Sequence, residues 1–167
     1  MIVRPADTTD ARGIAEVHVE TWRATYGGVM PQHVLDELDV GERERMWTRL
    51  IAHADLSVFV AESEGRTVGF ANVGACRDEP ATGELYAIYV RPSLHGSGAG
   101  QALMDASVRW LAERWDEAVL WVATENPRAR RFYERNEWTV DGERVDESLV
   151  GAPLPETRYR LSGLKRR

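Results

Sequence analysis

The chain has 167 residues, of which 43% are hydrophobic and 29% are charged, and its formal net charge is −6. This length and apolar content are enough for one buried core, which excludes a disordered chain. A single cysteine excludes a disulfide framework and a cysteine-based zinc site, and an acidic chain without a long basic stripe is a poor nucleic-acid binder.

Membrane and secretory signals are also missing from the sequence. No run of about 20 apolar residues is present, so we expect no membrane-spanning helix and no membrane partner. Residues 1–7 contain no apolar signal-peptide stretch, and the lone Cys76 suits a reducing compartment. We therefore expect a cytoplasmic protein with no nucleic-acid partner.

The N-terminal part predicts one strand and then helices. The expected elements are a strand at 2–5 and helices at 10–25, from Pro31 onwards and at 42–53. A cluster of good N-cap residues at 7–10 begins the first helix, and Gly27-Gly28 ends it. Proline suits the first turn of the second helix, because the N–H that it lacks is unpaired there.

The rest of the chain alternates extended and helical patterns. The expected elements are strands at 56–62, 67–75, 85–90, 118–123, 138–140 and 157–161, and helices at 99–114 and 126–135. The first two strands form a hairpin around Glu64-Gly65. A hairpin followed by strand–helix–strand units predicts a mixed α/β fold with a crossover. We expect one domain at 1–163 and a basic tail at 164–167.

A glycine-rich loop precedes the helix expected at 99–114. Its residues are His95, Gly96, Ser97, Gly98, Ala99 and Gly100. Glycine lets the backbone approach a ligand, and a helix start offers unpaired N–H groups, so the loop is a candidate phosphate cradle. Gln101 and Ala102 exclude a P-loop, and the glycine spacing does not fit the Rossmann fingerprint. A turn without any ligand is the alternative.

Two motifs lie in register along this part of the chain. The loop at 95–100 fits the frame Gln/Arg-x-x-Gly-x-Gly/Ala, with His95 in the first position. The pattern Asn-x-x-Ala-x-x-Phe-Tyr-Glu matches Asn126, Ala129, Phe132, Tyr133 and Glu134. Together they resemble the GNAT superfamily of acyl-CoA-dependent N-acetyltransferases. The resemblance implies a single-domain GNAT-like fold with a mixed, mostly antiparallel central sheet flanked by helices.

The resemblance also implies acetyl-CoA as cosubstrate. Backbone groups of Ile88 and Val90 would pair with the pantetheine arm, and amides of the loop at 95–100 would hold the pyrophosphate. Asn126 would contact the cosubstrate near the pantetheine, and Tyr133 would stand beside the sulfur. A side-chain contribution from His95 stays open, because the family usually has Gln or Arg there.

Acyl transfer to an amine needs a neutral amine, a donor for the oxyanion and a proton for the departing thiolate. Tyr133, a phenol that is protonated at neutral pH, is the expected general acid. Glu84 is the expected base, and strict alternation places it with Tyr86 and Ile88 on one face of the strand and the intervening residues on the other. A Phe-Tyr pair in the core and a solvated Glu84 are the alternatives.

The acceptor is expected between the first two helices and the sheet. Trp22, Tyr26 and Tyr86 are the candidate substrate-binding residues. Arg23 is either an exposed arginine or a partner for a substrate carboxylate. The expected acceptor is a small-molecule primary amine, acetylated by direct attack in a ternary complex. A protein N-terminus or lysine as acceptor, and a sensor of acyl-CoA without turnover, are the alternative functions.

The remaining charged and titratable residues carry weaker expectations. His18, His33 and His53 lack metal-ligand spacing, so no metal is expected. The acidic stretch at 141–147 is expected to be a solvated hairpin or loop face. A homodimer is a possible assembly, with the strand at 157–161 as the candidate contact.

Overall fold

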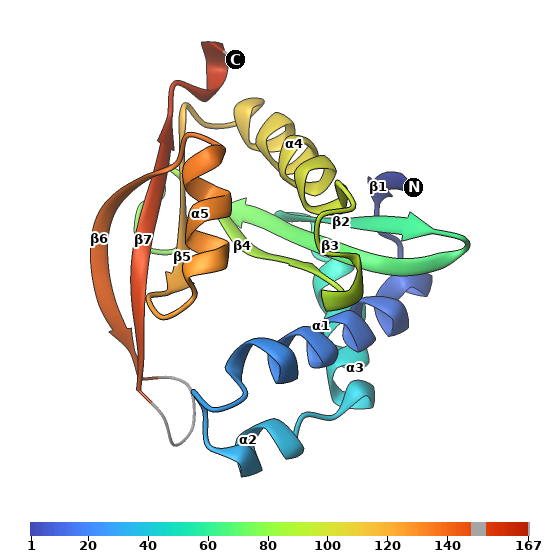
Figure 1. Cartoon of the computed structure of the whole chain (residues 1–167). Helices are drawn as coiled ribbons and strands as arrows, with labels where there is room; N and C mark the ends of the chain where they lie inside the picture. Colours follow the sequence, from blue (N-terminus) through green and yellow to red (C-terminus); the bar gives the residue numbers. More distant parts are fainter. Residues whose placement is uncertain (148–152, 167) are drawn as a thin grey trace.

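The computed structural model describes residues 1–147 and 153–166. The chain forms one seven-stranded sheet in the order β1-β2-β3-β4-β5-β7-β6 (Figure 1). Strands β4 and β5 pair in parallel, and the other neighbouring pairs among the described strands are antiparallel. The expected mixed, mostly antiparallel sheet flanked by helices is therefore confirmed.

The elements follow the predicted order. The strands are β1 (Ile2–Pro5), β2 (Leu56–Ser63), β3 (Arg66–Ala75), β4 (Gly83–Val90), β5 (Glu117–Ala123), β6 (Thr139–Asp146) and β7 (Leu154–Ser162). The α-helices are α1 (Ala11–Tyr26), α2 (Gln32–Asp36), α3 (Val40–Ile51), α4 (Ala99–Ala112) and α5 (Pro127–Arg135). Short 3-10 turns lie at Thr8–Asp10, Pro92–Leu94 and Leu164–Arg166.

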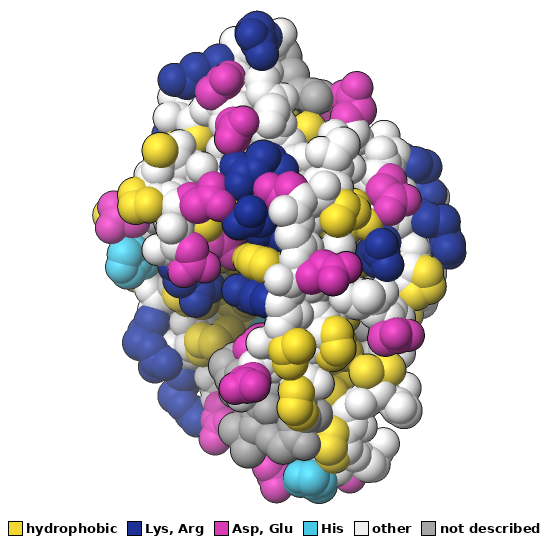
Figure 2. Space-filling model, turned by 90° about the vertical axis from the view of Figure 1, so that its left-hand side faces the viewer, with side chains coloured by type: hydrophobic (Ala, Val, Ile, Leu, Met, Phe, Trp, Pro, Cys, Tyr) yellow, Lys and Arg dark blue, Asp and Glu magenta, His cyan; other side chains and the backbone are white. Residues whose placement is uncertain are grey.

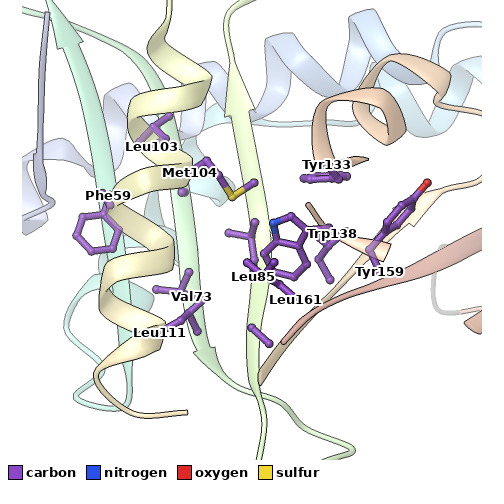
Figure 3. Close-up of a cluster of buried hydrophobic side chains, with 14 of the residues drawn as sticks. Phe59, Val73, Leu85, Leu103, Met104, Leu111, Tyr133, Trp138, Tyr159 and Leu161 are labelled. Carbon is purple, nitrogen blue, oxygen red and sulfur yellow. The ribbon is translucent and has the colours of Figure 1, made fainter. Parts of the chain in front are cut away.

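Helices cover both faces of the sheet. On one face α1 and α3 bury Ile14 and Trp47 against Phe70 of β3. On the other face α4 buries a row of side chains, including Leu103, Met104 and Leu111, against the strands (Figure 3). Leu164 belongs to this second cluster and is 1% exposed, so this residue of the expected tail packs against the core.

Strand β4 carries a β-bulge that changes which residues share a face. Asn72 of β3 pairs with Ala87 and the next residue, Val73, pairs with Leu85, so Tyr86 is the extra residue. Leu85 therefore packs on the α4 face, whereas Ala87 faces α1 and α3. The expected grouping of Glu84, Tyr86 and Ile88 on one face is wrong, because the bulge interrupts the alternation.

The parallel pair β4–β5 is very short. Only Gly83 with Ala118 and Glu84 with Val119 are in register. Beyond these pairs the two strands diverge, and the sheet opens into two halves, β1–β4 and β5–β7 (Figure 1). The C-terminal half of β4 therefore has a free edge on the side that faces β5.

Strand β7 is an interior strand. It pairs with β5 on one side and with β6 on the other. Thr157, Tyr159 and Leu161 are 0–2% exposed and point into the core. Both backbone edges of β7 and its inward side chains are therefore occupied within the chain, and a homodimer contact at 157–161 stays a prediction.

The acidic stretch after Trp138 is a strand with paired charges. Asp141 of β6 and Glu79 each bind both Arg158 and Arg160 of β7, at 2.6–2.8 Å. Charged side chains of both signs are intermixed on this side of the molecule (Figure 2). The stretch is thus a largely exposed strand paired with β7, and Asp141 is ion-paired there. The strand was predicted too short because Asp and Gly are poor strand formers, and pairing with β7 overrides that preference.

Candidate active site

A cavity of about 540 Å³ lies where β4 and β5 separate. Its walls come from the end of α1, from β4, the glycine loop, β5, α5 and the facing parts of β6 and β7. The expected site residues that line it are Trp22, Tyr26, Tyr86, Ile88, Val90, His95, Gly96, Gly98, Gly100, Asn126 and Tyr133. Ser97, Ala99 and Glu84 are not among the lining residues.

The glycine loop forms one end of the cavity. Gly96 and Gly98 have φ angles of 86° and 90°, a left-handed backbone that a side chain makes costly. Gly98 is the N-cap of α4, so the first amides of this helix start at the cavity. The α4 N-terminus thus offers N–H donors and a positive dipole end to an anion.

His95 is exposed, and its ring turns back onto the strand. Its Nε2 lies 3.0 Å from the carbonyl oxygen of Val90, and its Nδ1 contacts the guanidinium of Arg128. Because a carbonyl can only accept, Nε2 carries the proton and Nδ1 accepts from Arg128. Burial and the nearby Arg128 charge both lower the pKa of His95, which keeps the ring neutral.

Asn126 lines the cavity and also begins α5. Its Oδ1 accepts a hydrogen bond of 3.1 Å from the amide of Ala129. This N-cap contact leaves the side-chain NH₂ group as a donor that a ligand in the cavity can use. One amide side chain therefore fixes the helix that carries Tyr133 and still faces the cavity.

Tyr133 lies further along α5 than Asn126, also at the cavity, and is 8% exposed. Burial raises the pKa of its hydroxyl well above the ordinary value, and Tyr89 adds to the effect. Within residues 1–147 and 153–166 the hydroxyl has no hydrogen-bond partner, although the residue lines the cavity. A protonated phenol without a partner is a donor available to a ligand.

Glu84 lies behind the cavity wall. It is 8% exposed and sits beside Cys76 and Arg77 at the short β4–β5 contact. Burial raises the pKa of its carboxyl, and Arg77 offsets part of that effect. Further along the strand, Tyr86 does reach the cavity, and its hydroxyl donates to the carbonyl of Ala75. Direct contact between Glu84 and a bound amine is therefore not provided by this geometry.

The aromatic wall expected from α1 is present. Trp22 and Tyr26 both line the cavity, with ring centroids 5.1 Å apart. The indole nitrogen of Trp22 donates to the Tyr89 hydroxyl at 3.2 Å, which ties α1 to β4. Thr21 also lines the cavity, and its buried hydroxyl has no partner among the described residues.

Arg23 does not take part in this wall. Its guanidinium donates to the backbone carbonyls of Leu35 and Leu38, at 3.3 and 3.0 Å. These contacts tie the end of α1 to the segment around α2. Arg23 is an exposed arginine, which is the alternative expected from the sequence, and its guanidinium is engaged by these backbone carbonyls.

Several lining residues were not expected from the sequence. They are Thr21, Thr25, Tyr89, Trp121, Arg128, Arg135, Asp146 and Glu156. For Arg128 a signal existed, because helical spacing from Phe132 places it on the cavity face of α5. The residues from β6 and β7 had no local signal, since their position depends on long-range strand pairing.

The described residues contain neither a metal site nor a membrane span. No cluster of three or more His, Cys, Asp or Glu side chains is arranged to hold a metal ion there. Within the same part of the chain no helix combines the length and apolarity that crossing a membrane requires.

Comparisons with known proteins agree with this geometry. The profile of the Acetyltransferase (GNAT) family matches residues 15–138. An uncharacterized N-acetyltransferase of Bacillus subtilis, YuaI, is 37% identical over 90% of this chain and 92% of its own length.

Two solved structures share the fold. The PaiA N-acetyltransferase of Thermoplasma acidophilum, in complex with coenzyme A, has a TM-score of 0.74 and 18% identity over 96% of this chain and 98% of its own. YncA of Salmonella typhimurium, with its cofactor acetyl-CoA, has a TM-score of 0.75 and 22% identity over 97% and 93%. The family match over most of the chain, the fold and the cavity establish that this protein belongs to the GNAT family of acyl-CoA-dependent acetyltransferases.

Proposed function

We propose that the protein transfers the acetyl group of acetyl-CoA to a primary amine of a small molecule. The observation that carries this proposal is the Tyr133 phenol, which is buried, protonated and without a partner among the described residues, in the gap between β4 and β5. A donor at that place suits the sulfur of a thioester that lies along β4.

The residues at the cavity fit acetyl-CoA. The free edge of β4 from Tyr86 to Val90 offers backbone groups to the amides of a pantetheine arm, as an added strand would. Gly96 and Gly98 keep the loop open to a phosphate. The Val90 carbonyl already accepts from His95, and its second lone pair serves a ligand.

The reaction needs no protein nucleophile. A neutral amine attacks the acetyl carbonyl, the carbonyl oxygen takes up negative charge, and the C–S bond then breaks. Tyr133 donates its proton to the departing sulfur. Its raised pKa keeps the phenol protonated before the reaction at all ordinary pH values.

The amine must lose a proton, and the cavity offers no direct base at Glu84. We propose that Glu84 acts through an intervening water, because it lies behind Tyr86 and not at the cavity surface. Asp146 and Glu156 do line the cavity, and Glu156 pairs with Arg144 at 2.7 Å. Carboxylates at this end attract an ammonium group before it is deprotonated.

A small acceptor is supported by the walls of the cavity. Trp22 and Tyr26 of α1 and Trp121 of β5 present large rings to it. Bulky aromatic walls favour a compact amine over an extended peptide.

The test measures acetyl transfer to a panel of small amines and of short peptides, with release of the CoA thiol as the readout. We expect turnover with small amines, and we expect Tyr133→Phe to lower kcat by about 10²-fold while CoA binding changes little. Unchanged turnover in Tyr133→Phe would remove the phenol from the mechanism. Faster turnover of peptides than of small amines would indicate a protein acceptor. Tight CoA binding without any turnover would indicate a sensor of acyl-CoA.

Tyr159→Phe is the matched control. It removes the same hydroxyl from a neighbouring ring, 6.0 Å from Tyr133 between centroids, in a residue that does not line the cavity. The Tyr159 hydroxyl donates to Glu134 at 2.8 Å and accepts from Arg130 at 3.0 Å, so its loss affects stability. We expect lower stability in this control with kcat close to that of the wild type.

A further inference from the structure

Arg128 is a cation at the cavity that has no counter-ion in the described part of the chain. It is exposed, lines the cavity next to the glycine loop, and takes part in none of the ion pairs between residues 1–147 and 153–166. Partial burial lowers the pKa of its guanidinium, and no acidic neighbour among these residues raises it again. By contrast Arg130, two residues along α5, binds the Tyr159 hydroxyl and lies near Glu134.

The guanidinium of Arg128 is held in place by a neutral group. His95 accepts from it through Nδ1, while its Nε2 donates to the Val90 carbonyl. The imidazole thus joins the end of β4 to the first turn of α5 across the mouth of the cavity. A neutral acceptor orients the guanidinium and leaves its full charge available, which a carboxylate would not do.

Other positive groups at the glycine-loop end of the cavity add to the positive potential of Arg128. The α4 N-terminus begins at Gly98, and Arg135 lines the cavity at the end of α5. The carboxylates that line the cavity, Asp146 and Glu156, lie on β6 and β7, apart from the glycine loop. The loop end of the cavity is therefore basic, and the carboxylates that line the cavity lie away from it.

We infer that Arg128 is a phosphate ligand of the cosubstrate site, and that His95 is the residue that positions it. The inference deepens the proposed function and rests on it, because it assigns the phosphate contact for acyl-CoA. The first position of the loop is Gln or Arg in the general motif. In this chain it is His95, whose imidazole is neutral. The cation comes instead from α5, and the imidazole directs it toward the ligand.

Two phosphate groups of coenzyme A share this chemistry, the pyrophosphate and the 3′-phosphate of the ribose. Both are anionic oxygens that a guanidinium fork binds with two parallel hydrogen bonds. The test therefore uses CoA and dephospho-CoA, which differ only in the 3′-phosphate.

The first experiment is calorimetric titration of CoA into the wild type, Arg128→Gln and Arg131→Gln. Arg131 lies on the same helix, is exposed and does not line the cavity, so it is the matched control for loss of one charge. We expect Arg128→Gln to weaken CoA binding by about 10- to 100-fold, the usual loss for a charge-assisted hydrogen bond, and Arg131→Gln to bind as the wild type does.

Dephospho-CoA identifies the phosphate group. If Arg128→Gln weakens CoA and dephospho-CoA by the same factor, Arg128 binds the pyrophosphate. If the loss is confined to CoA, Arg128 binds the 3′-phosphate. Equal binding of CoA by Arg128→Gln and the wild type overturns the inference, as does an equal loss in Arg131→Gln. No CoA binding by the wild type contradicts the proposed function itself, which is a distinct result.

The positioning role of His95 is tested by a double-mutant cycle with His95→Phe. We expect His95→Phe to weaken CoA binding by a smaller factor than Arg128→Gln, and the double variant to bind no more weakly than Arg128→Gln alone. Losses that multiply would show that His95 acts independently of Arg128 and would contradict its positioning role. Melting temperatures of all variants separate these effects from loss of folding, and a fall in wild-type affinity with added salt gives a second measurement of the ionic contact.

Discussion

The indole nitrogen of Trp47 donates a hydrogen bond to Nδ1 of His18, with 3.1 Å between the two nitrogens. His18 is 7% exposed and its ring lies against Trp47 of α3 and Phe70 of β3. An Nδ1 atom that accepts a hydrogen bond cannot carry a proton, so the native ring is neutral. Burial, and secondarily the Arg43 charge, lower the pKa of His18 to about 4.

This contact predicts loss of stability in mild acid. The unfolded chain binds a proton at His18 below about pH 6.5, while the native state resists it down to about pH 4. The free energy of unfolding should fall by about 3 kcal/mol as the pH decreases from about 6.5 to about 4. Above about pH 6.5 the full stabilisation should be present. Urea unfolding at a series of pH values measures this slope. His18→Gln keeps an acceptor for Trp47 and should flatten the slope; an unchanged slope would assign the acid sensitivity to other groups.

Substitution of two glycines with positive φ distinguishes effects on stability from effects on CoA binding. Gly98 at the cavity and Gly65 in the β2–β3 turn have φ angles of 90° and 72°. Among the described residues, no atom would lie closer than 4.0 Å to a Cβ added at either position, so the strain of Ala comes from the backbone. Each Ala variant should lose about 1–2 kcal/mol of stability. Only Gly98→Ala should also weaken CoA binding, by about tenfold. Equal CoA binding in both variants would show that the loop conformation does not serve the ligand.

Loss of the hydrogen bond between Trp22 and Tyr89 should weaken binding of the acceptor amine. Trp22→Phe keeps an aromatic wall but removes the N–H that orients the Tyr89 hydroxyl. The KM for the best amine of the panel should rise about 3- to 10-fold, and the Kd for CoA should stay within about twofold. Steady-state kinetics and calorimetry give the two constants. Trp110→Phe, on α4 and away from the cavity lining, should change neither.

The β2–β3 turn offers a stabilising substitution. Glu64 has a φ of 51° beside Gly65, a conformation in which Asn-Gly is the preferred pair. Glu64→Asn should raise stability by about 1 kcal/mol and the melting temperature by about 2–4 °C. Glu64→Gln removes the charge without relieving the backbone, so a similar gain in that variant would assign the effect to charge.

Local signals predicted the fold well. The cap cluster at 7–10, the Glu64-Gly65 turn and the glycine loop are each contiguous in sequence, so their positions could be predicted from the chain. The Asn126–Tyr133 motif lies within one helix and its cap, which is why its face toward the cavity was predictable. The bulge at Tyr86 was not, because it depends on the register with β3.

The missing parts of the site are those that depend on distant elements. Alternation along β4 would bring Glu84 to the cavity, and the bulge two residues later separates it from that surface. Arg128 reaches the glycine loop only because α5 folds back beside it, and Glu156 reaches the cavity only through the pairing of β7 with β5. Helical spacing could place Arg128 on the cavity face of α5, but it could not predict the contact with the glycine loop.

The short β4–β5 contact has a consequence for how the molecule keeps its shape. Few backbone hydrogen bonds join the two half-sheets, because the β4–β5 pairing is short. Side chains of α4 connect them instead: Leu103 and Leu111 lie in one hydrophobic core with Val73 of β3 and Leu161 of β7. The angle between the half-sheets, and with it the width of the opening between β4 and Tyr133, is thus set by core packing. A core substitution that touches no ligand can therefore alter the spacing between the edge of β4 and the phenol of Tyr133.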